Sequence, residues 1–309
     1  MIPTRTPHRL HRIVIGLVLL FTASRMHAAD TSWNLTLRSR AGSTNATGNG
    51  NDAPAVVEKK VTWDPKKTAV IVCDMWDNHW CKGAAQRVVE LAGPMNEVLR
   101  KARADGAFII HAPSSVTGFY QDTPQRRAAR TAPFAMAPVP LSTADRWGTK
   151  WCWPDPARER DLPIDDTDMG CDCAVKCTIR DAWTRQIATL QIEPGDALTD
   201  DGQETFNLLQ SHHIDNVVLL GVHLNMCVLG RPFGIRQMVK VGKNVALMRD
   251  MTDTMYNHEK RPQVNHFRGT DLVVEHVETY WCPSFTSSDV TGRPAFQFRQ
   301  STASASSKK

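Results

Sequence analysis

The stretch Asn216-Val-Val-Leu-Leu-Gly221-Val-His-Leu-Asn-Met-Cys227-Val228 joins a strongly apolar run to a cysteine. The apolar run predicts a buried strand, and we expect a helix to begin near Cys227. Backbone N–H groups at a helix start are unpaired and carry partial positive charge. They stabilise a thiolate and can later hold the oxyanion of an attacked carbonyl. Cys227 is therefore a candidate nucleophile, and a buried structural cysteine is the alternative.

A second apolar run, Thr68-Ala-Val-Ile-Val-Cys-Asp74, ends in a carboxylate. It is too continuous for a half-exposed strand and predicts a strand covered on both faces of a parallel sheet. In open α/β sheets the residues that bind and convert ligands lie at the carboxyl ends of the strands. We therefore expect Asp74 and Cys227 to meet at one edge of the sheet.

Two motifs in this order, Val72-Cys-Asp-Met-Trp-Asp77 and Gly221-Val222-x4-Cys227-Val228, resemble the isochorismatase-like cysteine hydrolase family. That family includes nicotinamidases and N-carbamoylsarcosine amidases, and the resemblance spans roughly residues 62–290. It implies a catalytic triad of Asp, Lys and Cys, in which Asp74 and Cys227 match the first and last members. It also implies oxyanion donors at the backbone of His223 and Cys227, and a cis peptide bond between Val222 and His223.

The lysine of that triad has no match. In the family it ends the third strand, where this chain has Thr189-Leu-Gln-Ile-Glu193-Pro-Gly-Asp196, and no lysine lies between Lys176 and Lys240. Glu193 is thus a candidate for the third catalytic position. Cations that could replace the lysine are Arg231, His79, His111 and Lys176. We place Arg231 first, because it follows Cys227 by one helical turn and its charge does not titrate away.

Further side chains follow the predicted strand ends, and we expect them to bind substrate: Trp76, His79, His111, Arg231 and Asp250. Asp77-x-His79 does not reproduce the Asp-x-His metal arrangement of some family members. No metal and no organic cofactor is therefore assigned, with a divalent metal as the alternative.

Alternating apolar strands and amphipathic helices predict an α/β fold, a three-layer α/β/α arrangement with a parallel, Rossmann-like sheet of about six strands. Strands are expected at 69–73, 107–111, 188–192, 216–221, 244–250 and 271–275, and helices at 84–104, 203–211 and 232–241. Residues 113–185 do not follow this alternation of strands and helices. They are rich in Pro, Trp, charge and Cys, and predict an ordered insertion or cap over the active site.

The two ends of the chain lie outside this domain. Residues 1–29 have arginines before an apolar core at 13–23 and small residues after it, which predicts a signal peptide and a secreted or periplasmic protein without a stable membrane anchor. A flexible arm at 30–60, with a short strand near Trp33 as an alternative, precedes the hydrolase domain at 61–290. The tail covers 291–309.

Eight cysteines are present, and an exported protein sits where disulfides persist. With Cys227 as nucleophile and Cys73 inside a strand, six remain. We expect most of the cysteines of the insertion to be oxidised, with Cys81 or Cys282 as partners. The insertion cysteines are Cys152, Cys171, Cys173 and Cys177. A metal held by the Cys171–Cys177 segment is the alternative.

The leading functional prediction is an exported hydrolase that cleaves the C–N bond of a small amide through a cysteine thioester. A non-catalytic binding protein and an isochorismatase-type vinyl-ether hydrolase are the alternatives. Removal of Arg5, Arg9, Arg12 and Arg25 lowers the net charge from +5 to about +1, which does not favour nucleic acid as a partner. The expected partner is a small-molecule substrate, and a homo-oligomer is compatible with the sequence.

Overall fold

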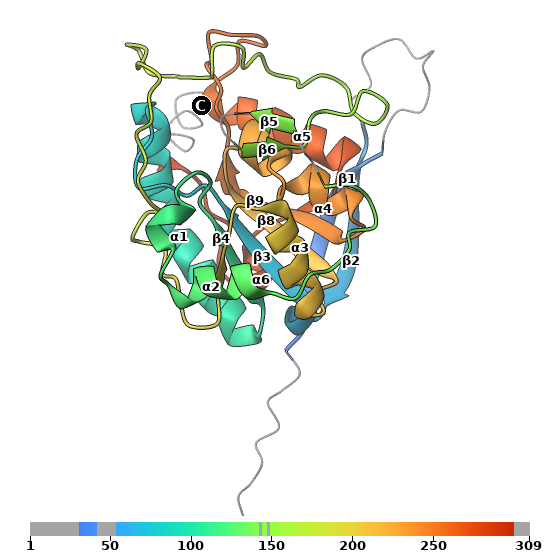
Figure 1. Ribbon diagram of the computed structural model, residues 1–309. Helices are drawn as coiled ribbons and strands as arrows, with labels where there is room; N and C mark the ends of the chain where they lie inside the picture. The colour runs from blue at the N-terminus through green and yellow to red at the C-terminus, as the bar shows by residue number, and fades with distance from the viewer. Residues whose placement is uncertain (1–30, 42–53, 142–143, 147–148, 300–309) are drawn as a thin grey trace, which may run out of the picture. The chain divides into compact units, whose positions relative to one another are not determined.

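The computed structural model describes residues 31–41, 54–141, 144–146 and 149–299. An eight-stranded sheet organises them (Figure 1). Its strands, in spatial order, are β2 (Val56–Trp63), β1 (Trp33–Arg40), β10 (Ser284–Phe285), β9 (Asn244–Asp253), β8 (Asn216–Val222), β3 (Thr68–Cys73), β4 (Phe108–Ala112) and β7 (Ala197–Leu198). The six strands from β10 to β7 are parallel, as predicted. The central strands β3 and β8 are buried along their whole length, which explains their continuous apolar sequence.

The predicted flexible arm at 30–60 contributes two strands instead. Strands β1 and β2 form an antiparallel pair, and β1 joins the sheet against β10. Trp33, Leu35 and Leu37 are buried at every second position of β1, so one face of the strand belongs to the core. This alternation is what fixes the arm in the sheet. Residues 42–53, the Gly-rich part of the predicted arm, lie outside the described residues.

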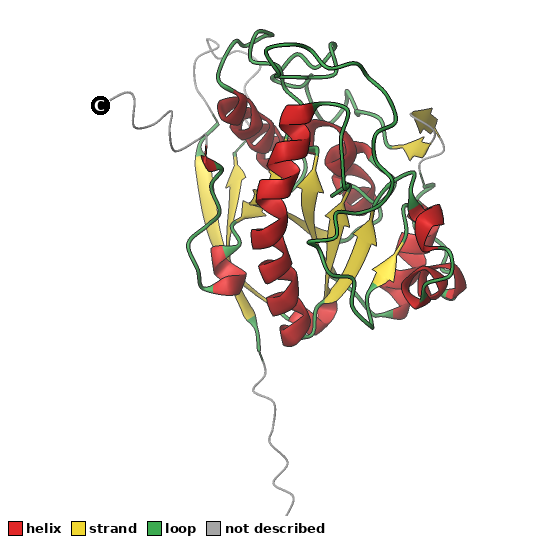
Figure 2. Cartoon of the chain, turned by 90° about the vertical axis from the view of Figure 1, so that its left-hand side faces the viewer, coloured by secondary structure: helices red, strands yellow, loops and turns green. Residues whose placement is uncertain are grey.

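Helices cover both faces of the sheet, as the three-layer prediction requires. The long helix α1 (Lys82–Asp105) covers one face, which Figure 2 shows from the front, and α6 (Ser288–Thr291) contacts it. The other face packs against α3 (Gly202–Ser211), α4 (Ile235–Lys240) and α5 (His266–Tyr280). Short 3₁₀ turns occur at η1 (Pro65–Lys67) and η2 (Thr117–Tyr120).

Two predicted strands are wrong. Residues 188–192 form a loop, and the strand in this part of the sheet is β7, after the Pro194-Gly195 turn. Residues 271–275 lie inside helix α5, which begins after an Asn265 side chain that accepts the Arg268 N–H. The buried positions Val273, Val274 and Val277 have helical spacing, and this outweighs the β-propensity of valine.

The insertion at 113–185 contributes η2, α2 (Pro124–Thr131) and a hairpin of β5 (Ala144–Arg146) and β6 (Thr149–Trp151). Most of its remaining backbone is irregular. It returns to the domain after β8, where the Cys152 N–H donates to the Gly230 carbonyl at 2.6 Å. The insertion therefore contacts the segment that carries the candidate nucleophile.

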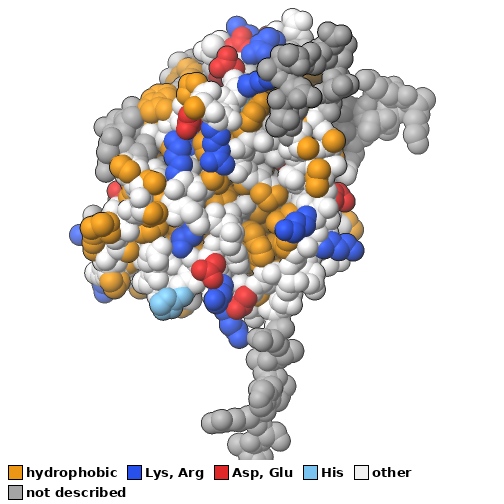
Figure 3. Space-filling view, turned by 90° about the vertical axis from the view of Figure 1, so that its right-hand side faces the viewer, with side chains coloured by type: hydrophobic (Ala, Val, Ile, Leu, Met, Phe, Trp, Pro, Cys, Tyr) orange, Lys and Arg blue, Asp and Glu red, His pale blue; other side chains and the backbone are white. Residues whose placement is uncertain are grey.

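No helix among the described residues is long and apolar enough to cross a membrane. On the face seen in Figure 3, basic side chains occur in small separate groups between apolar and uncharged ones. The predicted signal peptide at 1–29 lies outside the described residues.

Candidate active site

Strands β3 and β8 end side by side, and this brings Asp74 next to the segment after β8. Cys73 pairs with Gly221 in the parallel register. Gly221 has φ 104, and a Cβ there would lie 2.1 Å from the Cys73 carbonyl oxygen. Glycine is therefore required where the two strand ends approach. Asp74 itself has φ 47, a left-handed conformation that aspartate tolerates better than most residues.

Three side chains converge at this point. The Asp74 carboxylate accepts the Ser114 N–H at 2.6 Å and lies close enough to the Cys227 thiol to raise the pKa of that thiol. The Nε atom of Arg231 lies 3.7 Å from the second carboxylate oxygen of Asp74, and its guanidinium also reaches Cys227. The exposed fractions are 0% for Asp74, 5% for Cys227 and 3% for Arg231. The structure thus places a carboxylate, a thiol and a permanent cation together, away from bulk solvent.

Burial dominates the electrostatics of this cluster. Burial and the neighbouring Asp74 raise the pKa of the Cys227 thiol well above its usual range, and Arg231 opposes this shift. Burial also raises the pKa of Asp74, although Arg231, Cys227 and Ser114 stabilise its ionised form.

Several polar atoms of the site have no hydrogen-bond partner within the described residues. They are the second carboxylate oxygen of Asp74, the Ser114 hydroxyl, and Nε and Nη1 of Arg231. Buried polar atoms in native proteins are normally paired, because an unpaired one costs about 1–3 kcal/mol. Unpaired donors and an acceptor at one place are what a polar ligand would satisfy.

The backbone around Cys227 differs from the predicted helix start. Cys227 lies in a five-residue π-helical turn, η3 (Leu224–Val228), and α4 begins only at Ile235. The intervening Gly230 has no room for a side chain, since a Cβ would lie 2.4 Å from the Trp151 ring. Pro232 follows and offers no N–H. The Val222–His223 peptide bond is cis, as the family resemblance implies.

An aromatic group lies beside this cluster. Trp76 stacks on Trp183 of the insertion, with ring centroids 4.4 Å apart, and its indole N–H donates to the Ser114 carbonyl. His79 packs between Trp183 and His223, and its Nδ1 accepts the Cys81 N–H. Burial lowers the pKa of His79 to about 4 and that of His223 well below its ordinary value. Both rings are therefore neutral near pH 7 and do not supply the missing cation.

Four other candidate residues form their contacts away from this cluster. His111 bonds to Gln186 and Asp196, and it faces the α1 side of the sheet. The Glu193 N–H donates to the Asp196 carboxylate at 2.8 Å, in the turn before β7. Lys176 pairs with Glu259 at the surface.

Asp250, the fourth candidate, accepts hydrogen bonds from Ser287 and the Phe296 N–H. It fastens the C-terminal segment, and it lies in β9 three residues before the end of the strand at Asp253. Asp77 is likewise occupied, because Thr184 donates to both of its carboxylate oxygens. The Asp77-x-His79 pair is therefore not arranged as a metal site.

Sequence reasoning missed two features of the site. Ser114, which follows β4 by two residues, holds Asp74 through its N–H. Asp253 ends β9 opposite Val222 and forms a buried ion pair with Arg87 and a hydrogen bond with His266. The signal available was the position of Asp253 at the end of an apolar strand, which is the same signal that identified Asp74.

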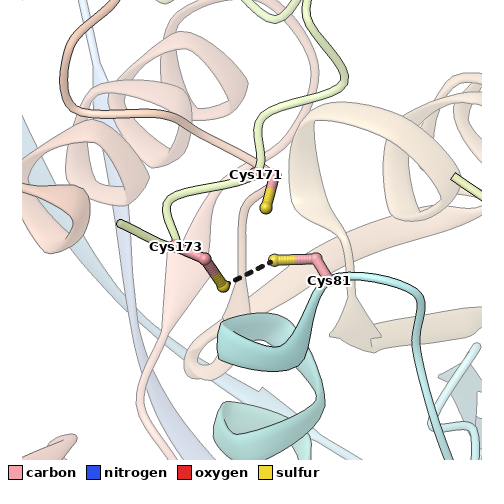
Figure 4. Close-up of side chains that lie close together, drawn as sticks. All are labelled: Cys81, Cys171 and Cys173. Atoms are coloured by element: carbon pink, nitrogen blue, oxygen red, sulfur yellow. Dashed lines mark hydrogen bonds between the residues drawn. The ribbon is translucent and has the colours of Figure 1, made fainter. Parts of the chain in front are cut away.

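The predicted disulfides are not present in the structure, in which all eight cysteines are free. Cys81, Cys171 and Cys173 instead form a cluster whose sulfur atoms all lie within 4.8 Å of one another (Figure 4). Three thiols that meet at one point cannot all be paired among themselves. Cys152 and Cys282 are buried separately from this cluster.

No protein-family model and no curated protein matches the chain. Among solved structures, a cysteine hydrolase from Pseudomonas syringae pv. phaseolicola 1448A is similar at 17% identity and TM-score 0.47, covering 74% of this chain and 93% of that one. The N-carbamoylsarcosine amidase of Thermoplasma acidophilum is similar at 12% identity and TM-score 0.38, covering 72% and 96%. The pyrazinamidase of Pyrococcus horikoshii, in complex with zinc, is similar at 16% and 0.40, covering 71% and 99%. Because these identities and TM-scores are low, the similarity by itself assigns no activity to this chain.

Proposed function

We propose that this chain is a cysteine hydrolase that cleaves the C–N bond of a small amide, with Arg231 in the place of the usual triad lysine. The observation that carries the proposal is the convergence of Asp74, Cys227 and Arg231 in one buried cluster. The motif resemblance predicted the first two residues. The third supplies a cation that the sequence lacks at its expected position.

In the proposed reaction, Cys227 attacks the amide carbon and its proton passes to Asp74. The sulfur–carbon bond forms, and the oxyanion faces the backbone N–H groups proposed at His223 and Cys227. Asp74 then gives the proton to the departing amine as the C–N bond breaks. Water, deprotonated by Asp74, attacks the thioester, and the returned proton restores the Cys227 thiol.

Arg231 has a defined part in this scheme. Its charge stabilises a Cys227 thiolate that otherwise faces only a carboxylate in a buried environment. Its unpaired Nε and Nη1 atoms, with the Ser114 hydroxyl, are donors for a polar group on the substrate. The stacked Trp76 and Trp183 favour a substrate with a flat apolar part.

The test is ammonia release from a panel of small primary amides, with aromatic and aliphatic members, by the wild-type protein and by Cys227→Ala. We expect turnover of at least one member by the wild type and none by the variant. Hydroxylamine added during turnover should trap a hydroxamate from the thioester. A panel without turnover, combined with a Cys227 that does not react with alkylating agents, would favour the non-catalytic alternative. Turnover of a vinyl ether that survives Cys227→Ala would favour the isochorismatase-type alternative.

Export belongs to this proposal as well, and the sequence of residues 1–29 supports it. Intact mass of the protein recovered from the periplasm or the medium should give a chain that begins near Asp30. A chain that keeps residues 1–29 and stays in the cytoplasm would contradict it.

A further inference from the structure

The thiols of Cys81, Cys171 and Cys173 come from two distant parts of the chain. Cys81 immediately precedes helix α1, and the other two lie in the insertion, about ninety residues later. Cys81 and Cys171 are buried, and Cys173 is partly exposed. Figure 4 shows the three side chains pointing toward a common centre. No step proposed for the active site uses these thiols.

The spacing of the sulfur atoms fits one tetrahedral metal ion. The Sγ atoms of Cys81 and Cys173 are 3.8 Å apart. A disulfide bond requires about 2.05 Å. Zinc binds cysteine sulfur at about 2.3 Å, and two ligands of a regular tetrahedron are then about 3.8 Å apart. The observed separation is that of two zinc ligands, rather than that of a disulfide.

Backbone N–H groups are directed at the sulfur atoms of this cluster. The Gly83 N–H donates to Cys173 Sγ at 3.3 Å from the first turn of α1, where backbone N–H groups are unpaired. The backbone N–H groups of Cys173 and Cys177 are directed at the sulfur of Cys171. Burial raises the pKa of the Cys81 and Cys173 thiols, so these two are protonated until an ion displaces their protons. N–H groups directed at sulfur are the second shell that stabilises metal-bound thiolates.

Ion pairs beside the cluster fix the loop that carries two of its thiols. Arg87 lies in a buried network with Asp172 and Asp253, and one Asp172 oxygen lies 3.7 Å from Cys81 Sγ. Asp172 sits between the two insertion thiols in the sequence, so the loop that carries them is also tied to α1 by an ion pair. The thiols are therefore held in place before any ion binds.

A fourth ligand and an access route are available. Cys177 is only partly buried and follows Cys173 by four residues, and its sulfur lies outside the group of three that are within 4.8 Å of one another, so it must approach them to complete a four-ligand site. A cavity of about 410 Å³, lined in part by Gly83, Asp172 and Cys173, borders the cluster. An ion can reach Cys173 through this cavity.

We propose that Cys81, Cys171, Cys173 and Cys177 bind one Zn²⁺ ion as a structural thiolate site that fastens the insertion to the start of α1. Binding displaces the thiol protons to solvent. The site is separate from the Asp74–Cys227–Arg231 cluster, and it does not depend on the proposed hydrolase function. It keeps the thiols reduced by occupying them with metal.

The test uses the full chain, purified without chelator, and metal analysis by mass spectrometry. We expect one zinc per chain in the wild type, and less than a tenth of that in Cys171→Ser/Cys173→Ser. The matched control is Cys152→Ser, which removes a buried thiol outside the cluster and should keep the full zinc content. Circular dichroism establishes that each variant folds.

Cobalt(II) exchanged into the site gives a second readout. The wild type should show intense thiolate-to-cobalt charge-transfer bands, and Cys177→Ser should lose about a quarter of that intensity per cobalt, as one of four ligands disappears. A folded wild-type protein with no zinc, a disulfide between Cys81 and Cys173, or zinc retained by the double variant would overturn the site. Unchanged cobalt bands in Cys177→Ser would overturn the assignment of the fourth ligand.

Discussion

Replacement of Arg231 by methionine tests the central feature of the proposed mechanism. The guanidinium Nε lies 3.7 Å from an Asp74 oxygen, and the pair is almost fully buried. With an effective dielectric constant of about 20, two unit charges at this distance attract by about 4 kcal/mol. The same guanidinium also opposes the rise in the pKa of the Cys227 thiol. An attraction of this order, when it is withdrawn from the thiolate, changes the thiol–thiolate equilibrium by up to about three factors of ten, at about 1.4 kcal/mol each. We therefore expect Arg231→Met to slow thiolate chemistry at Cys227 by about 10²- to 10³-fold at neutral pH.

The measurement is the alkylation rate of Cys227 across pH, followed on the Cys227 peptide by mass spectrometry so that the other seven cysteines do not contribute. Arg231→Lys keeps a cation and should retain most of the reactivity. Arg160→Met removes an exposed arginine of the insertion and should change nothing. Equal alkylation rates at every pH in wild type and folded Arg231→Met would mean that Arg231 does not stabilise the Cys227 thiolate.

Three further perturbations follow from the same structure. Asp74→Asn should abolish amide hydrolysis but keep the thermal stability of the protein at pH 7. Burial raises the pKa of Asp74, so ionisation of this carboxyl opposes folding above its unfolded pKa. A melting temperature that is several degrees lower at pH 7 only would contradict this. His79 has a pKa of about 4 in the folded state and 6.5 in the unfolded state. The unfolded state therefore binds the proton first, and the free energy of unfolding should fall by about 3 kcal/mol as the pH drops from 6.5 to 4. Urea unfolding of His79→Gln should lose this pH dependence, and an unaltered pH dependence would assign it to other groups. Gly230→Ala places a Cβ against the Trp151 ring and should lower the free energy of unfolding in urea by about 1–3 kcal/mol. The control is Gly93→Ala in α1, where a Cβ meets nothing within 4 Å and should not destabilise the protein. Equal effects of the two substitutions would argue against the Trp151 contact.

The parallel core was predictable because its signals are local. Strands β3, β4, β8 and β9 are apolar runs, and the helices between them have helical spacing of apolar residues. Asp74 and Cys227 were predictable because a parallel sheet brings its carboxyl ends together. For β1, the alternation of Trp33, Leu35 and Leu37 was visible, but the surrounding Ser, Gly and Asn residues outweighed it.

The parts that sequence could not give depend on contacts between distant segments. His111 follows an apolar run as Asp74 does, yet it faces the α1 side, where Arg103 and Asp196 surround it. The convergence of Cys81 with Cys171 and Cys173 depends on the path of an irregular insertion, which has no periodic pattern to follow. The residue types suggested the chemistry, and only the path of the chain fixed which thiols meet.

The position of the cation links the insertion to the proposed chemistry. The stretch matched to the family lysine, residues 189–196, contains no cation and ends at Asp196, which accepts hydrogen bonds from Arg103 and lies against His111 on the other side of the sheet. The cation comes instead from Arg231, four residues after Cys227, whose guanidinium lies 5.5 Å from the Trp151 ring. Trp151 belongs to the insertion and also packs on Gly230. An arginine after the nucleophile therefore needs a neighbouring surface that orients its long side chain, and Trp151 of the insertion provides this surface. Trp151 of the insertion thus borders the proposed catalytic cluster, and Trp151→Ala should lower the alkylation rate of Cys227 through Arg231.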